Sequence, residues 1–265
     1  RSFMTLINTN IIAIANQKGG VGKTTTVINL ATAMAACNKK VLIIDSDPQG
    51  NASTGLGLDK TVLENSFYDL IRGDISINKV IVKTQIPNLF IIPTSMDLAV
   101  VEQEFVNIEK REERLKKEIE KINMPFDYIL IDCPPSLGLL TLNALVACRN
   151  LLVPLQVEFY ALEGLTQLME TVNQIKNNYN NLLTLQGIVL TMYDKRNKIS
   201  ELVACDVKNF FKEKVYKTII PRNVKISEAP SHGMPILMYD ISCSGSQAYA
   251  SLAAEIINQE NKLNG

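Results

Sequence analysis

The stretch "IIAIANQKGGVGKTTT", residues 11–26, decides the fold, because it joins an apolar run to a glycine-rich loop and then to a helix-like segment. The loop nearly matches the pattern of one glycine, four residues and then Gly-Lys-Ser/Thr, in which backbone N–H groups and the lysine hold phosphate oxygens. Gln17 stands where the first glycine is expected, and a second lysine, Lys18, follows it. The stretch therefore predicts a phosphate-binding loop between a strand and a helix, with one additional cation.

Strand-like and helix-like segments alternate along the rest of the chain. Short runs rich in branched apolar residues predict strands at 11–15, 41–45, 89–92, 128–132, 150–155, 186–192 and 216–220. Helix-like segments lie between or after them, at 23–37, 96–121 (broken), 139–148, 161–178, 199–213 and 244–261. This alternation predicts an α/β fold with a mostly parallel, twisted sheet and helices on both faces.

Composition favours one domain. Of the 265 residues, 46% are hydrophobic, which suffices for one large core, and no Pro/Gly/Ser-rich linker divides the chain. We expect residues 1–3, which precede Met4, to be an expression remnant, and residues 4–265 to form a single domain. No apolar stretch approaches the roughly 20 residues of a membrane span. Five cysteines without a CxxC pair indicate reduced thiols and a cytoplasmic location.

The loop and two acidic strand ends together predict a magnesium–nucleotide site. Gly19, Gly20 and Gly22 allow close approach of the backbone to phosphate, Lys23 would neutralise the β- and γ-phosphates, and the Thr24 hydroxyl would bind Mg²⁺ at this site. The acidic strand ends are "IDSDPQGN" (44–51) and "IDCPPS" (131–136), which present Asp45, Asp47 and Asp132.

Ligands of parallel α/β sheets bind beyond the carboxyl ends of the strands, so these side chains are expected to meet there. Asp132 is predicted to orient Mg²⁺ through water. A glycine loop alone could arise by chance, but a loop followed in order by two acidic strand ends favours the functional interpretation.

Five segments together resemble the ParA/Soj family of chromosome and plasmid partition ATPases, which belongs to the deviant Walker-A group of P-loop proteins. The segments are "KGGVGKTTT" (18–26), "DSDPQGNAS" (45–53), "DCPPSLGLLTLNAL" (132–145), "EFYALEGLTQL" (158–168) and "IPRNVKISEAPSHGMPI" (220–236). The resemblance implies a P-loop fold and slow, partner-stimulated hydrolysis of ATP to ADP and phosphate, with ATP and Mg²⁺ as cofactors.

The resemblance also implies roles for single residues. Lys18 would reach across a two-fold interface to the partner subunit's nucleotide, so that ATP joins two subunits; elsewhere such a lysine would be only a solvated loop residue. Asp47 would position the attacking water. Asp45 would brace the loop and the magnesium shell, or merely cap its strand. The implied ATP-binding residues are Lys18, Gly19, Gly20, Val21, Gly22, Lys23, Thr24, Thr25, Pro221 and Asn223, with Asn16 and Met192 as further candidates.

DNA binding is expected from a basic segment. Residues 195–225 hold nine Lys/Arg and three acids in a chain whose net charge is zero, which is typical of non-specific phosphate binding. The resemblance implies contacts to double-stranded DNA at Arg196 and Lys225. It also implies a ParB-type centromere-binding partner and association with the nucleoid. A merely solvated surface is the alternative.

Other functions of the same protein group remain open at this point. A MinD-like membrane and cell-division ATPase would need a basic amphipathic C-terminal helix, whereas residues 250–265 hold one lysine and two glutamates. An iron–sulfur electron carrier would need two suitably placed cysteines, and only Cys133 lies near the predicted site. A small-molecule kinase or synthetase fits poorly with the 220–236 segment.

Overall fold

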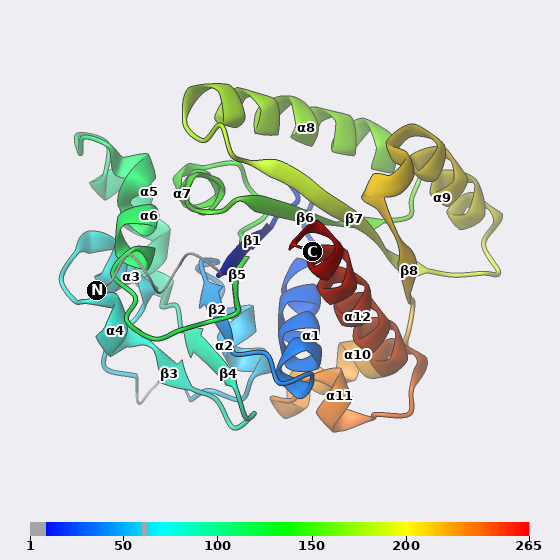
Figure 1. The fold of residues 1–265 in the computed structure, drawn as a ribbon, viewed down its shortest axis with the longest axis horizontal. Coiled ribbons are helices and arrows are strands. Elements are labelled where there is room, and N and C mark those ends of the chain that lie inside the picture. Colours follow the sequence, from blue (N-terminus) through cyan, green and yellow to red (C-terminus); the bar gives the residue numbers. More distant parts are fainter. Residues whose placement is uncertain (1–8, 60–62, 265) are drawn as a thin grey trace.

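The computed structural model describes residues 9–59 and 63–264, whose strands form one sheet (Figure 1). Its order is β3-β4-β2-β5-β1-β6-β7-β8, and all neighbours are parallel except β3 and β4. The strands are β1 (Asn10–Ile14), β2 (Val41–Asp45), β3 (Val82–Lys83), β4 (Leu89–Ile92), β5 (Tyr128–Asp132), β6 (Asn150–Gln156), β7 (Thr184–Tyr193) and β8 (Val215–Pro221). The predicted α/β fold is confirmed, and the two-residue antiparallel β3 is an addition to it.

Helices cover both faces of the sheet. The long helices are α1 (Lys23–Ala36), α7 (Leu139–Ala147), α8 (Ala161–Asn178), α9 (Lys198–Phe211) and α12 (Ser244–Asn264). The short ones are α2 (Asn51–Gly55), α3 (Phe67–Arg72), α4 (Ile77–Val80), α5 (Val101–Glu104), α6 (Arg114–Ile119), α10 (Val224–Glu228) and α11 (Ile236–Tyr239). Single 3₁₀ turns lie at Met96–Val100, Arg111–Glu113, Lys212–Lys214 and Ala229–His232. None of the described helices combines the length and apolar character that crossing a membrane requires.

The strands bury side chains on both faces, which explains their continuous apolar runs. In β1, Ile12 and Ile14 pack with α1 and α12, whereas Ala13 packs into the opposite core with α7 and α8. Successive side chains of a strand point to opposite faces, so only a strand covered on both sides is apolar at every position. Burying an aliphatic side chain of this size contributes about 1.5–3 kcal/mol, and the two cores therefore hold the sheet between its helix layers.

The outer strand β8 is bound by a carboxylate of α12. Glu255 accepts hydrogen bonds from the backbone N–H groups of Lys217, at 2.8 Å, and Thr218, at 3.0 Å. The same helix buries Tyr249, Leu252 and Ile256 against the sheet. Helix α12 is thus fixed to the sheet both by packing and by hydrogen bonds.

Gly187 marks a close approach between β7 and β8. A Cβ atom added there would lie within 3.0 Å of three ring atoms of Tyr216, a buried side chain of β8. An aromatic ring cannot rotate away from such a contact as a flexible chain end can. The position therefore requires glycine for space.

We expect Gly187→Ala to lower the free energy of unfolding by about 1–3 kcal/mol, because it overpacks the core at the Tyr216 ring. The matched control is Gly164→Ala at an exposed position of α8, where an added Cβ meets no atom within 4 Å. That variant should unfold at the same or a higher urea concentration, since alanine favours a helix over glycine by about 0.5–1 kcal/mol. Equal urea midpoints for the two variants would contradict the packing argument.

Candidate nucleotide-binding site

The glycine-rich loop lies between β1 and α1, as predicted. Gly20 and Gly22 have φ angles of 74° and 89°, in the left-handed region that favours glycine. Gly22 is the N-cap of α1, and no side chain caps the helix there. The first turn of α1 also lacks acidic residues, so its backbone N–H groups are suited to an anionic ligand.

Hydrogen bonds to two neighbouring strands fix the loop. Asn16 donates to the carbonyl oxygen of Pro154 in β6 at 2.8 Å and accepts from the Lys18 N–H at 3.1 Å. The Thr191 hydroxyl of β7 donates to the carbonyl oxygen of Val21 at 2.8 Å. The Asn16 amide is therefore engaged within the protein and shapes the loop. Thr191 belongs to no sequence motif, so its contact with the loop could not be predicted from the sequence.

The two loop lysines occupy different environments. Lys23 is 6% exposed, and its Nζ donates to the carbonyl oxygen of Lys18 at 2.9 Å. Burial lowers the pKa of Lys23, and the nearby Asp132 and Asp47 partly oppose that shift. The Lys18 side chain is instead 53% exposed and forms an ion pair with Glu158, which follows β6. Lys23 thus lies inside the loop, while Lys18 lies at its rim.

Asp45 and Asp132 lie opposite each other in register at the carboxyl ends of β2 and β5. Both are fully buried. Asp45 Oδ2 accepts hydrogen bonds from the Ser53 N–H and hydroxyl, at 2.9 and 2.6 Å. Asp45 Oδ1 and both oxygens of Asp132 have no hydrogen-bond partner among the described residues, although the Thr24 hydroxyl lies near enough to Asp132 to favour its ionised form. Buried carboxylate oxygens without donors fit a site for a hard cation.

Burial raises the pKa of both carboxyls, and repulsion adds to it, from Asp47 on both groups and from Asp45 on Asp132. For Asp132, burial is the largest cause and the charge of Asp45 the second, and together they raise its pKa well above the usual range. Burial raises the pKa of Asp45 to about 6, against the hydrogen bonds from Ser53. A cation between or beside these groups would restore their ionised forms.

Asp47 completes the acidic group. It is largely buried and accepts a hydrogen bond from the Gln49 N–H at 2.9 Å. Its charge contributes to the pKa of Asp45, Asp132 and Lys23, which places all four near one another. Within residues 9–59 and 63–264, no three His, Cys, Asp or Glu side chains form a metal-binding cluster by themselves. A magnesium site here would need phosphate or water oxygens as further ligands.

A separate cavity of about 330 Å³ adjoins the loop. It brings together the residues expected at the nucleotide base with two residues of the loop and helix start: Met192, Pro221, Asn223, Gly22 and Thr25. Its size falls at the lower end of small-ligand sites. Met192 has a φ of 53°, a left-handed conformation that is uncommon for a non-glycine residue and often marks functional sites.

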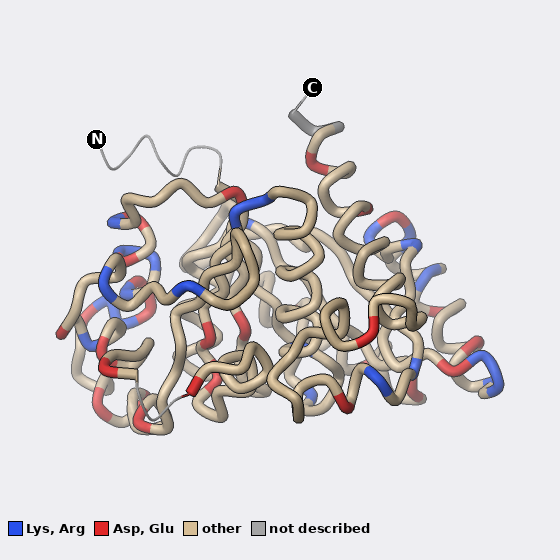
Figure 2. Tube along the Cα trace, turned by 90° about the horizontal axis from the view of Figure 1, so that it is seen from below, with Lys and Arg blue, Asp and Glu red and all other residues tan. Residues whose placement is uncertain are grey.

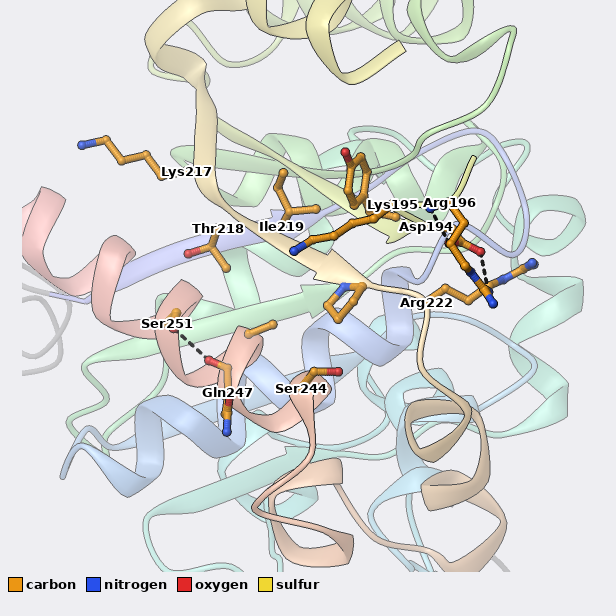
Figure 3. Close-up of a pocket in the computed structure, with 13 residues that line it drawn as sticks. Asp194, Lys195, Arg196, Lys217, Thr218, Ile219, Arg222, Ser244, Gln247 and Ser251 are labelled. Carbon is orange, nitrogen blue, oxygen red and sulfur yellow. Dashed lines mark hydrogen bonds and ion pairs between the residues drawn. The ribbon is translucent and has the colours of Figure 1, made fainter. Parts of the chain in front are cut away.

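The residues expected at DNA do not line one cavity. Basic and acidic positions are interspersed along the chain trace (Figure 2). Arg196 lines a cavity of about 840 Å³, which we call the basic groove (Figure 3). Lys225 lies outside its lining, 3.5 Å from Glu228 and over the ring of Tyr239.

Comparison with other proteins agrees with this arrangement. A family profile described as "AAA domain" matches residues 9–185. The chain is 54% identical over 252 residues to "Chromosome partitioning protein ParA" of Caulobacter vibrioides, with 94% of each chain covered. It is 50% identical over 246 residues to "Sporulation initiation inhibitor protein Soj" of Bacillus subtilis, covering 93% of this chain and 97% of that protein.

Solved structures show the same fold. A cobyrinic acid a,c-diamide synthase from Mycobacterium smegmatis with bound ADP and magnesium is 34% identical, with a TM-score of 0.84 and 96% of each chain covered. The septum site-determining protein MinD from Pyrococcus horikoshii, complexed with Mg-ADP, is 26% identical, with a TM-score of 0.76 and coverage of 94% and 96%. From the family profile and the near-complete coverage of its relatives, the chain belongs to the ParA/Soj family of chromosome-partitioning ATPases.

Proposed function

We propose that this protein is an ATP-dependent DNA-segregation ATPase. The observation that carries the proposal is the position of a phosphate-type loop beside two buried carboxylates with unpartnered oxygens, with a second lysine at the rim. In this proposal an ATP-bound dimer binds DNA non-specifically in the cytoplasm, at the nucleoid. Hydrolysis, stimulated by a ParB-type partner, releases the dimer from DNA. Family membership supports the proposal, because relatives at 54% and 49% identity are named for chromosome partitioning.

The residues of the site divide the work of hydrolysis. The N–H groups of Gly19 to Gly22 and the Lys23 ammonium would bind the phosphates, while Asp132 and the Thr24 hydroxyl would hold Mg²⁺. Bound magnesium would neutralise phosphate charge as it develops. Asp45 is fixed by Ser53, so it would keep one oxygen for the magnesium shell and brace the loop with the other. Asp47 would orient the water that attacks the γ-phosphorus as the bond to the ADP oxygen breaks.

Lys18 provides the connection between hydrolysis and dimerisation. Its exposed ammonium can leave Glu158, because an exposed ion pair stabilises by only about 0–1 kcal/mol. Placed against the nucleotide of a second subunit, it would stabilise negative charge as an arginine finger does. ATP would then favour the dimer, and through linkage the dimer would favour ATP.

A MinD-like membrane ATPase is the alternative, and helix α12 speaks against it. A membrane-binding helix must present an apolar face. The apolar residues Tyr249, Leu252 and Ile256 of α12 are instead buried in the core of the domain. Glu255 and Glu260 of the same helix bind groups of the sheet.

Substitution of the lysines tests their separate roles. We expect Lys23→Ala to weaken ATP binding by roughly 10- to 100-fold, because charged hydrogen bonds contribute about 1.5–3 kcal/mol. Lys18→Ala should bind ATP nearly as the unchanged protein does but stay monomeric. Titration calorimetry and sizing with ATP and ADP measure both effects, with exposed Lys208→Ala on α9 as the control. An ATP-dependent dimer of the Lys18 variant would exclude the cross-subunit role.

Asp47→Ala should bind ATP and Mg²⁺ and accumulate as a dimer. Its phosphate release should fall by roughly 100-fold, since the attacking water is no longer positioned. Phosphate release and sizing are compared with those of Asp74→Ala, an exposed aspartate that follows α3. Normal turnover of the Asp47 variant would assign this role to another residue.

The buried carboxylates predict a pH dependence of stability in the metal-free protein. The pKa of Asp45 is about 6 in the folded state, above the ordinary value of about 3.9, so the folded state binds more protons between these values. The free energy of unfolding should therefore fall as pH rises from about 4 through 6, by about 2–3 kcal/mol from this group. Asp45→Asn keeps an oxygen for Ser53 and should remove most of this fall.

Urea unfolding at several pH values without Mg²⁺ measures the effect. The control is Asp206→Asn, an exposed aspartate of α9, which should unfold with the same pH dependence as the unchanged protein. If the Asp45 variant also keeps that dependence, burial of the Asp45 carboxyl is not its cause.

A further inference from the structure

One wall of the cavity beside the glycine loop is residues 221–230, which we call the base wall. Ile226 and Pro230 line the cavity there, together with Pro221 and Asn223, the residues expected at the nucleotide base. The base wall contains α10, and none of the five residues of that helix is buried. Core packing of α10 therefore does not determine where the wall lies, and its position depends on how the neighbouring chain is held.

A buried asparagine of α1 holds the chain just after the base wall. Asn29 Oδ1 accepts a hydrogen bond from the Ile236 N–H at 2.7 Å, and Asn29 Nδ2 donates to the carbonyl oxygen of Thr25 at 2.8 Å. Ile236 begins α11, and the first N–H groups of a helix have no acceptor within that helix. Asn29 is 4% exposed and Ile236 is fully buried, so bulk water does not compete for their bond.

Short contacts connect Ile236 to the base wall. The Gly233 N–H donates to the carbonyl oxygen of Pro230 at 3.0 Å. Gly233 also packs directly on Gly57, because a Cβ atom added to either glycine would lie 2.9 Å from a backbone atom of the other. The chain between the base wall and α11 is therefore compact, and a displacement of Ile236 would also displace Pro230.

The other hydrogen bond of Asn29 leads to the phosphate side of the cavity. Thr25, which accepts that bond, lines the cavity and lies in the first turn of α1, directly after the glycine loop. Helix α11 lies beside α1 and α12 (Figure 1). Both bonds require the same orientation of the Asn29 amide, since its oxygen can only accept and its nitrogen can only donate. One buried side chain thus joins the helix that begins at the glycine loop to the chain that carries the base wall.

We infer that Asn29 is a positioning residue for nucleotide binding, which holds the base wall at a fixed distance from the glycine loop. The inference rests on the proposed function, in which Pro221 and Asn223 contact the base of ATP. Asn29 does not line the cavity, so it acts on the nucleotide through Ile236. Without this bond, a bound base would have to order the wall, and the lost conformational entropy would reduce the affinity.

Removal of the Asn29 amide should weaken binding of the whole nucleotide but not of phosphates alone. Asn29→Ala leaves the buried Ile236 N–H without its acceptor, so affinity for ATP and for ADP should fall by about 5- to 20-fold. Affinity for inorganic tripolyphosphate, which has no base, should change by less than about 2-fold, because its contacts lie away from the base wall. Phosphate release at saturating ATP should also stay within about 2-fold, since a loss of ground-state binding raises KM and leaves kcat unchanged.

Titration calorimetry with ATP, ADP and tripolyphosphate, each with Mg²⁺, measures these affinities. Asn29→Leu is the second variant, because leucine fills the space of asparagine but accepts no hydrogen bond. It should lower the ratio of ATP affinity to tripolyphosphate affinity as Asn29→Ala does.

Asn143→Ala is the matched control. Asn143 is 1% exposed, accepts from the Leu115 N–H at 3.1 Å and donates to the carbonyl oxygen of Arg111 at 3.0 Å. It therefore joins α7 to the start of α6 as Asn29 joins α1 to α11, but it lies outside the lining of the cavity. Its substitution should lower the urea midpoint and leave the affinity ratio unchanged.

The outcomes separate this inference from the proposed function. A lower affinity ratio in both Asn29 variants, with an unchanged ratio in Asn143→Ala, supports the inference. If both Asn29 variants keep the ratio of the unchanged protein, or if Asn143→Ala lowers it equally, Asn29 only stabilises the fold and the inference is wrong. If neither Asn29 variant binds tripolyphosphate, Asn29 supports the glycine loop instead of the base wall, and the inference is also wrong. Absence of ATP hydrolysis by the unchanged protein would overturn the proposed function, whereas the affinity ratio tests the inference alone.

Discussion

Two carboxylates, Asp45 and Asp132, end adjacent parallel strands in register, and they are buried with three of their four oxygens unpartnered among the described residues. Such an arrangement opposes folding, because burial and repulsion both disfavour the charges. The rest of the structure makes it tolerable: apolar strands fix the two strand ends, Ser53 satisfies one oxygen, and the Lys23 ammonium lies close by. The sheet thus keeps two energetically costly carboxylates buried at its carboxyl edge, which fits the magnesium and phosphate site that we propose there.

The division between the two loop lysines follows from the same geometry. A lysine near buried carboxylates must itself be buried, and Lys23 is. Lys18 lies on the solvent side of the loop, next to Glu158 and the exposed aromatic residues Phe159 and Tyr160. Exposed aromatic rings beside a weakly held cation are typical of a surface that another molecule covers. The second lysine, by which this loop departs from the usual phosphate-loop pattern, therefore differs from Lys23 in being exposed.

Sequence patterns predicted the buried strands and the long helices well and the short helices poorly. The bounds of β4, β5 and α8 agree with the expected 89–92, 128–132 and 161–178, because continuous burial or a strong helical period determines them. Helices of four to six residues, such as α3 and α10, were not predicted, since tertiary contacts stabilise such short segments. The loop and its acids were predictable because their order along the chain is itself the pattern. The ion pairs of the basic segment could not be predicted from its composition. Asp194 and Glu228 lie just outside the counted 195–225 segment, and they pair with Arg196 and Lys225.

Glu255 accepts hydrogen bonds from the N–H groups of Lys217 and Thr218, and these bonds affect how copies of the chain can associate. A terminal strand with free N–H groups is a template for a strand of another molecule, and repeated pairing of that kind grows into open fibres. Here a side chain of the same molecule already occupies those donors on β8. Strand addition is therefore disfavoured along this part of β8, because two of its backbone donors already have a partner within the molecule.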